Sequence, residues 1–88
     1  MIEFTHQIKD PNGMHARPAG KLATMAKQFK SDIRVKTDAK EADAKRLLAL
    51  MSLGVKSGAT ITVTVSGEDE ETAAEQLKAF LEHPTNGD

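Results

Sequence analysis

The chain has 88 residues, of which 39% are hydrophobic, and this is enough for one small globular domain and argues against disorder. A formal net charge of −1 gives no general attraction to nucleic acid, and the absence of cysteine excludes disulfides and thiol chemistry. The sequence shows neither a signal peptide nor an apolar run long enough to span a membrane. We therefore interpret residues 1–88 as a single domain, with a cytoplasmic location and no membrane insertion.

The first segment alternates between apolar and polar residues, which is typical of a strand with one buried face. Ile2, Phe4, His6 and Ile8 share one parity, and the residues between them are polar or charged. Because no cluster of cysteine, histidine or carboxylate residues accompanies His6, we interpret it as a structural residue and not as a metal ligand.

A turn and then a helix follow this strand. Residues 11–13, Pro-Asn-Gly, are three turn-forming residues in succession. Pro18 suits the first turn of a helix, where a missing N–H costs nothing. The spacing of the next apolar residues predicts a helix over about 16–28. Its predicted core stripe consists of Ala19, Leu22, Ala23 and Ala26.

His15 lies directly before this predicted helix. The free N–H groups and the dipole at a helix start favour an anion, and phosphate in particular. Arg17 adds a guanidinium group suited to bidentate phosphate contact. These surroundings favour neutral imidazole, which is the nucleophilic form, so the pattern indicates phosphoryl transfer through His15. The alternative is a surface histidine beside a capped helix, with a solvated Arg17.

The segment 11–31 contains no Asp or Glu but several basic residues. This distribution predicts a basic surface that complements an acidic protein partner, whereas the alternative is an ordinary solvated helix face. Gly20 lies off the core stripe of the predicted helix. Either it lets a partner approach closely beside His15, or it reflects neutral drift. The basic side chains of the segment are His15, Arg17, Lys21, Lys27 and Lys30.

Two further strands are predicted in the middle of the chain. Ile33, Val35 and Thr37 alternate with charged residues, which indicates a second strand. After a turn at 38–39, residues 40–43 form a short, charged third strand that suits a sheet edge.

The next segment predicts a compact helix over 44–53, closed by Gly54 at its C-terminal end. This helix carries more leucine and methionine than one face can bury. We expect Leu50 and Leu53 to face the core. The remaining apolar residues then point partly outward and suggest a protein-binding surface. The alternative is a helix buried on more than one side. The outward residues are Leu47, Leu48 and Met51.

The last elements are a clear strand over 60–66 and a helix opened by the carboxylates of 68–71, which complement its dipole. Residues 84–88 form a polar tail that we expect to be frayed. The element order is therefore β-α-β-β-α-β-α. Because each strand has one apolar parity, we predict an α+β fold in which three helices cover one sheet face and the other face is wet.

The segment 13–19, Gly-Met-His-Ala-Arg-Pro-Ala, resembles the active-site signature of the HPr family, the histidine phosphocarriers of the bacterial phosphoenolpyruvate:sugar phosphotransferase system. The resemblance runs from about Ile2 to Leu81 without a gap. It includes the predicted second helix up to Gly54 and the entry to the third helix at 67–70. The resemblance implies an HPr-like open-faced β-sandwich with a four-stranded antiparallel sheet in the spatial order 1-4-2-3.

The resemblance also implies roles for individual residues. His15 matches the histidine that accepts a phosphoryl group on Nδ1 from phosphorylated enzyme I and donates it to enzyme IIA domains of sugar permeases. Arg17 and the N–H of Ala16 match the groups that steady the phosphoryl group. Thr24 replaces a basic contact residue found in many relatives. The implied partner surface consists of Gly20, Lys21, Lys27, Leu47, Leu48 and Met51.

In such a relay the chain is a protein substrate and not an enzyme acting alone. The sequence shows neither a metal-ligand cluster nor a glycine-rich nucleotide loop, so we expect no cofactor and a phosphoryl group activated on another protein. We expect a monomer with enzyme I, enzyme IIA domains and regulatory proteins as partners. Two alternatives stay open, a nitrogen-branch regulatory carrier and an interaction module that transfers nothing.

Arg46 is the main departure from the family pattern. Many Gram-positive relatives carry a serine there, which a dedicated kinase phosphorylates to control carbon-source choice. Arginine cannot accept that modification, so the kinase-dependent role is not expected for this chain.

Overall fold

The structure is a computed structural model, and it describes residues 1–9, 13 and 16–82. The described elements follow the predicted order of strands and helices. They are β1 (Ile2–Gln7), α1 (Ala16–Ala26), β2 (Asp32–Lys36), β3 (Glu41–Asp43), α2 (Leu47–Ser52), β4 (Thr60–Ser66) and α3 (Glu70–Glu82).

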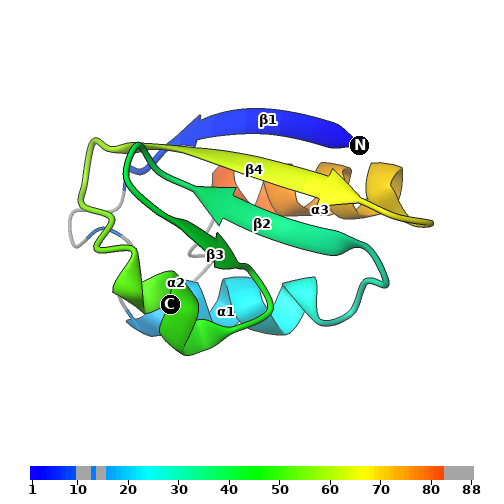
Figure 1. The fold of residues 1–88 in the computed structure, drawn as a ribbon, viewed down its shortest axis with the longest axis horizontal. Coiled ribbons are helices and arrows are strands. Elements are labelled where there is room, and N and C mark those ends of the chain that lie inside the picture. The colour runs from blue at the N-terminus through cyan, green and yellow to red at the C-terminus, as the bar shows by residue number, and fades with distance from the viewer. Residues whose placement is uncertain (10–12, 14–15, 83–88) are drawn as a thin grey trace.

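The four strands form one antiparallel sheet in the order β1-β4-β2-β3 (Figure 1). Val63 in β4 pairs with Phe4 on one side and with Val35 on the other. The sheet order implied by the family resemblance is thereby confirmed. The short, charged β3 forms one edge of the sheet, as predicted, and β1 forms the other.

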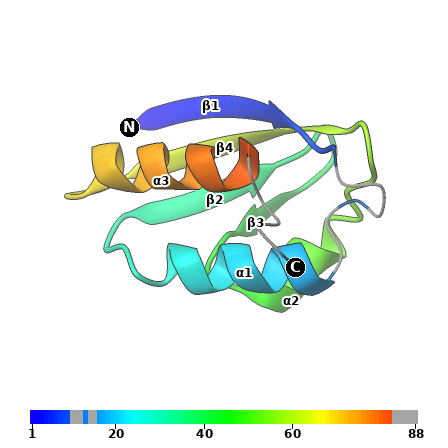
Figure 2. The ribbon, with the colours of Figure 1, turned by 180° about the vertical axis from the view of Figure 1, so that it is seen from behind.

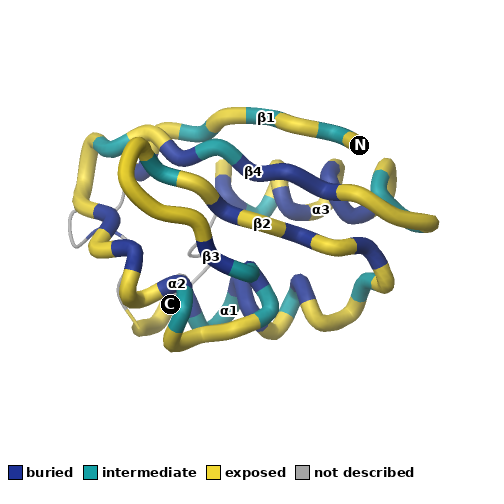
Figure 3. Tube along the Cα trace, viewed as in Figure 1, coloured by how far each residue is buried: buried dark blue, intermediate teal, exposed yellow. Residues whose placement is uncertain are grey.

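One face of the sheet carries the core and the other is open. α1 and α3 lie across the covered face, and α2 packs against α1 near β3 (Figure 2). Burial alternates along β2 and through most of β4, as their apolar parity predicts (Figure 3). The side chains of β1 that face the core are only half-buried, because an edge strand has a neighbour on one side alone. The fully buried strand residues include Ile33, Val35, Ile61, Val63 and Val65.

The predicted start of the second helix at Ala44 is wrong. The Ala44 N–H donates to the carbonyl of Ile33 over 2.9 Å, so this residue continues the pairing between β2 and β3. The Asp43 carboxylate accepts the N–H of Lys45 at 2.9 Å, which closes a turn. Arg46 then adopts an extended conformation, with φ −118° and ψ 110°, and α2 begins at Leu47.

The predicted bounds of the other helices also shift. α1 ends at Ala26 and not at about Gln28, because the N–H of Gln28 donates to the Met25 carbonyl in a tighter turn, over 3.0 Å. α3 begins at Glu70. The tail at 84–88 lies outside the described residues, and the interpretation of 1–88 as a single domain stays a prediction.

Asp69 has a role that its sequence position did not indicate. Its carboxylate accepts the N–H groups of Lys30 and Ser31, both at 2.9 Å, and the Ser31 hydroxyl at 2.5 Å. The hydroxyl bond and then the Lys30 N–H bond lower the pKa of Asp69 below its ordinary value. This residue therefore fastens the loop before β2 to the start of α3, in addition to complementing the helix dipole.

Glu70 fastens the beginning of the chain in a similar way. Its carboxylate accepts the Gly67 N–H at 3.1 Å and pairs with the Met1 ammonium at 3.2 Å. These contacts, with the Gly67 N–H first, lower the pKa of Glu70. The start of β1 is thereby held beside the first turn of α3.

Candidate functional site

The candidate site is at the start of α1. His15 lies outside the described residues, and its place is defined here only by its neighbours in the chain. Ala16 and Arg17 are the first two residues of α1, and both are exposed. Pro18 stands in the same turn, as predicted, where its missing N–H leaves no gap in the helix bonds.

The first turn of α1 has the electrostatic character of an anion site. N–H groups in the first turn of a helix have no partner within the helix, and the dipole places partial positive charge there. No acidic residue stands in this turn of α1. The guanidinium of Arg17 adds a full positive charge to the same end. The arrangement is therefore suited to hold a phosphoryl group near the helix start.

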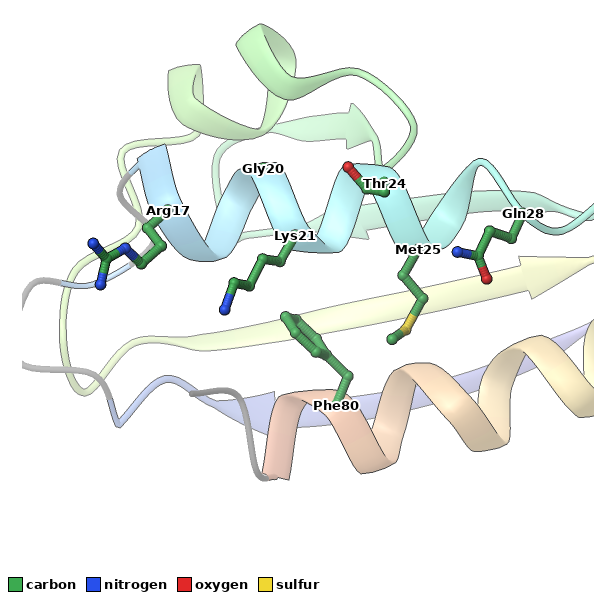
Figure 4. Close-up of a pocket in the computed structure, with 7 residues that line it drawn as sticks. All are labelled: Arg17, Gly20, Lys21, Thr24, Met25, Gln28 and Phe80. Carbon is green, nitrogen blue, oxygen red and sulfur yellow. The ribbon is translucent and has the colours of Figure 1, made fainter. Parts of the chain in front are cut away.

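A shallow groove of about 590 Å³ runs along α1 on the side that faces α3 (Figure 4). Arg17 and Lys21 stand along one part of it, Thr24 and Gln28 continue the polar side, and no carboxylate of the described residues lines it. Met25 from α1 and Phe80 from α3 supply apolar contact. The described residues that line it are Arg17, Gly20, Lys21, Thr24, Met25, Gln28 and Phe80.

The structure thus brings three of the predicted site residues, Arg17, Gly20 and Lys21, into one groove. A side-chain carbon added at Gly20 would meet nothing within 4 Å, so the glycine leaves the surface open and is not required by packing. Lys27 is not part of the groove. It lies one residue beyond the end of α1 and is exposed.

The second cluster of predicted residues forms an exposed apolar surface on α2, here called the α2 patch and made of Leu47, Leu48 and Met51. Their exposed fractions are 38%, 80% and 40%. On the same helix Leu50 is fully buried, and Leu53 follows it into the core. The division into inward and outward residues is as predicted, and the alternative of a helix buried on more than one side is wrong.

Arg46 stands beside the α2 patch at the N-cap position of α2. Its side chain makes no capping hydrogen bond and is exposed. A cation at this end of a helix opposes the dipole. Arg46 lies one position before the first helical residue of α2.

Sequence reasoning missed three residues of the groove, Met25, Gln28 and Phe80. Met25 and Gln28 follow Lys21 at helical spacing, so the signal was present in the α1 pattern. Phe80 packs against the core and also lines the groove. Its second role depends on how closely α3 approaches α1, which no local pattern shows.

His6 is half-buried on β1, and burial lowers the pKa of its imidazole, with a further contribution from Lys9. Among residues 1–9, 13 and 16–82 there is no group of histidine, cysteine and carboxylate side chains that would hold a metal ion. In the same residues no helix is both long and apolar enough to cross a membrane.

Comparison with known proteins identifies the family. Residues 2–83 match the family model described as the PTS HPr component phosphorylation site. The chain belongs to the HPr family. The phosphocarrier protein HPr of Mycoplasma genitalium is 45% identical over 83 residues, which are 93% of this chain and 94% of that protein. The HPr-like protein Crh of Halalkalibacterium halodurans is 42% identical over 82 residues, covering 93% and 98%.

A solved HPr structure agrees with the fold. The crystal structure of HPr from Thermoanaerobacter tengcongensis superposes with a TM-score of 0.93 at 38% identity, covering 100% of this chain and 99% of the other. This member of the HPr phosphocarrier family therefore has the family fold over its full described length.

Proposed function

We propose that this HPr-family chain is a phosphoryl carrier of the sugar phosphotransferase system in which His15 is the acceptor. His15 receives the phosphoryl group from phosphorylated enzyme I and donates it to enzyme IIA domains. The lone pair of Nδ1 attacks phosphorus, and the bond from phosphorus to the donor breaks as the bond to Nδ1 forms. The reverse exchange with the acceptor protein returns the imidazole to its neutral form, so the chain is a relay intermediate and not an enzyme acting alone.

The observation that carries this proposal is the exposed first turn of α1, directly after His15, with Arg17 and no acidic side chain. The N–H groups of this turn, that of Ala16 among them, and the Arg17 guanidinium stabilise the charge of the phosphoryl group without reorganisation. Catalysis of phosphoryl transfer rests mainly on placement and charge stabilisation, which such a site supplies.

The surfaces around α1 support transient exchange with acidic partners. Within the part of the chain that the structure describes, the groove is lined by Arg17 and Lys21 and by no carboxylate, and the α2 patch adds apolar contact on the other side of α1. Charge complementarity speeds encounter, while a small apolar contact gives modest affinity. Gly20, Lys21, Lys27 and the α2 patch are therefore the proposed contact surface for enzyme I and enzyme IIA domains. We further propose that the chain is cytoplasmic and monomeric. Light scattering is the direct measurement of the monomeric state.

Intact-mass spectrometry with enzyme I and phosphoenolpyruvate tests the proposal. The wild-type chain should gain one acid-labile phosphoryl group, and His15→Ala should gain none. His6→Ala is the matched control and should be labelled as the wild type is. A folded chain that stays unlabelled with several enzyme I preparations would contradict the carrier role, and the α2 patch would then indicate a module that binds a regulator. Transfer from the labelled chain to sugar or nitrogen-branch IIA proteins separates the two carrier functions.

A further inference from the structure

Gly13 makes an unusually close backbone contact two residues before His15. It is buried and has a φ of +70°. A side-chain carbon at this position would lie 2.8 Å from the Cα of Lys56 and closer still to the carbonyl oxygen of Val55. Real side-chain carbons do not approach backbone atoms so closely, so glycine is required here for space as well as for its conformation.

Among the other loop glycines that the structure describes, Gly67 comes comparably close to Ser31, whereas Gly54 and Gly58 make no such contact. Gly54 has nearly the same conformation, with a φ of +65°, and Gly58 has a φ of +91°. A side-chain carbon at either position would meet nothing within 4 Å. Their backbone conformations favour glycine, but no described residue occupies the space of a side chain.

The segment that Gly13 contacts also binds the chain before Gly13, at Ile8. Residues 55–59, here called the platform, form the turn that leads into β4. The N–H of Ile8 donates to the carbonyl of Ala59 over 2.8 Å, and the N–H of Gly58 donates to the carbonyl of Ile8 over 2.7 Å. The side chain of Val55 is buried in the core and fixes the beginning of the platform.

The chain around His15 is therefore fixed at described points on both sides. Ile8 and Gly13 contact the platform before it, and Ala16 begins α1 directly after it. Only three Cα–Cα steps, of about 3.8 Å each, join Gly13 to Ala16. A displacement of Gly13 thus moves the start of a very short link that contains the proposed acceptor.

We propose that Gly13 is a positioning residue for phosphoryl transfer, and that its contact with the platform fixes the start of the short link to Ala16 in which His15 stands in the sequence. The inference rests on the proposed function of His15. A methyl group at position 13 must push the backbone away from Val55 and Lys56. The start of that link then moves relative to Arg17 and the first turn of α1, while the groove and the α2 patch stay in place.

The test compares Gly13→Ala with Gly54→Ala in phosphoryl transfer from enzyme I. Both variants place alanine at a positive φ, but only the first meets backbone atoms. We expect kcat of Gly13→Ala to fall by roughly 10-fold to 100-fold with little change in KM for the carrier, because a shift of about 1 Å near the reacting group can cost about 100-fold in rate. Rates are expressed per folded chain, with the folded fraction taken from urea unfolding followed by circular dichroism.

A second pair of variants keeps Gly13 and changes the packing of the platform. It tests the proposal even if Gly13→Ala does not fold. Val55→Ala and Val65→Ala each remove two methyl groups from a buried valine, but only Val55 belongs to the platform. Val55→Ala should lower kcat per folded chain more than Val65→Ala does. Equal kcat within each pair, at equal folded fraction, would overturn the positioning role and leave the carrier function intact. An unlabelled wild-type chain would instead overturn the carrier function itself.

Discussion

The Ser31 hydroxyl donates to the Asp69 carboxylate over 2.5 Å, and the N–H of Ser31 donates to the same carboxylate over 2.9 Å. Ser31 is fully buried, and a side-chain carbon at Gly67 would lie 2.7 Å from its Cα. The loop before β2 and the turn before α3 are therefore fitted together by one polar cluster and one close backbone approach.

Acid should weaken the fold through Asp69. Because hydrogen bonds lower the pKa of Asp69 in the folded chain, the unfolded chain binds the proton more readily. The contribution to stability is complete above the unfolded pKa, about 3.9, and is lost as pH falls through the lower folded pKa. Urea unfolding at pH 7 and pH 3 should show a smaller difference for Asp69→Asn than for the wild type. Glu70, whose pKa is also lowered, adds to the remaining pH dependence, so an unchanged difference in Asp69→Asn would contradict the assignment to Asp69.

Removal of Arg17 should slow transfer without unfolding the chain. Arg17→Ala is expected to lower the rate of phosphoryl transfer by roughly 100-fold or more, since the loss of one donor to a developing charge costs about 10²–10³ in rate. Arg34→Ala removes the same charge from the open sheet face and is the control. A time course of labelling by mass spectrometry measures both. Equal rates for the two variants would show that only net charge matters.

Alanine substitutions at two leucines of α2 should distinguish an effect on partner binding from an effect on the stability of the fold. Leu48 is 80% exposed, so Leu48→Ala should change the free energy of unfolding by less than about 0.5 kcal/mol. Leu50 is fully buried, and Leu50→Ala should cost about 2–5 kcal/mol. If the α2 patch contacts partners, Leu48→Ala should raise KM for the carrier about fivefold or more, as truncation of a central interface residue does. A KM equal to that of the wild type would remove Leu48 from the contact surface.

Arg46 should be replaceable with a gain in stability. Its backbone already has the extended conformation of an N-cap, but its side chain caps nothing. Arg46→Ser supplies an acceptor for the free N–H groups of α2 and should add about 1 kcal/mol. That gain corresponds to a rise in Tm of about 4–8 °C for a domain of this size. Arg46→Ala removes the charge without adding an acceptor, so the same rise in both variants would attribute the gain to charge alone.

The strands were predictable from sequence because their signal is local. Ile33 and Val35 alternate with charged residues, and Ile61 and Val63 alternate with threonines. Such a pattern requires only that one face of the strand be buried, and both pairs are buried. The order of the strands was not contained in that pattern. It entered through the family resemblance, because the partner of an edge strand depends on the path of the whole chain.

The errors and omissions at the helix ends and at the site have a tertiary cause. Ala44 has a helical preference, but its N–H bonds to Ile33 in the neighbouring strand, and this contact delays α2. Gly13 was predicted as a turn residue, and its positive φ agrees with that prediction. Its contact with Lys56 was not predictable, because the two residues meet only after the sheet has brought β1 and β4 together. Asp69 was missed as an anchor of Ser31 for the same reason.

The edge position of β1 has a consequence for synthesis on the ribosome. Of the described elements β1 emerges first, yet its one neighbour among the described strands is β4, which is made after four intervening elements. At about 5–20 residues per second, the first strand waits for several seconds before its partner exists. The platform contacts and the Glu70 pair with Met1 also join early residues to late ones. The nascent chain is therefore expected to stay open until α3 has left the exit tunnel, and then to close its sheet in one late event.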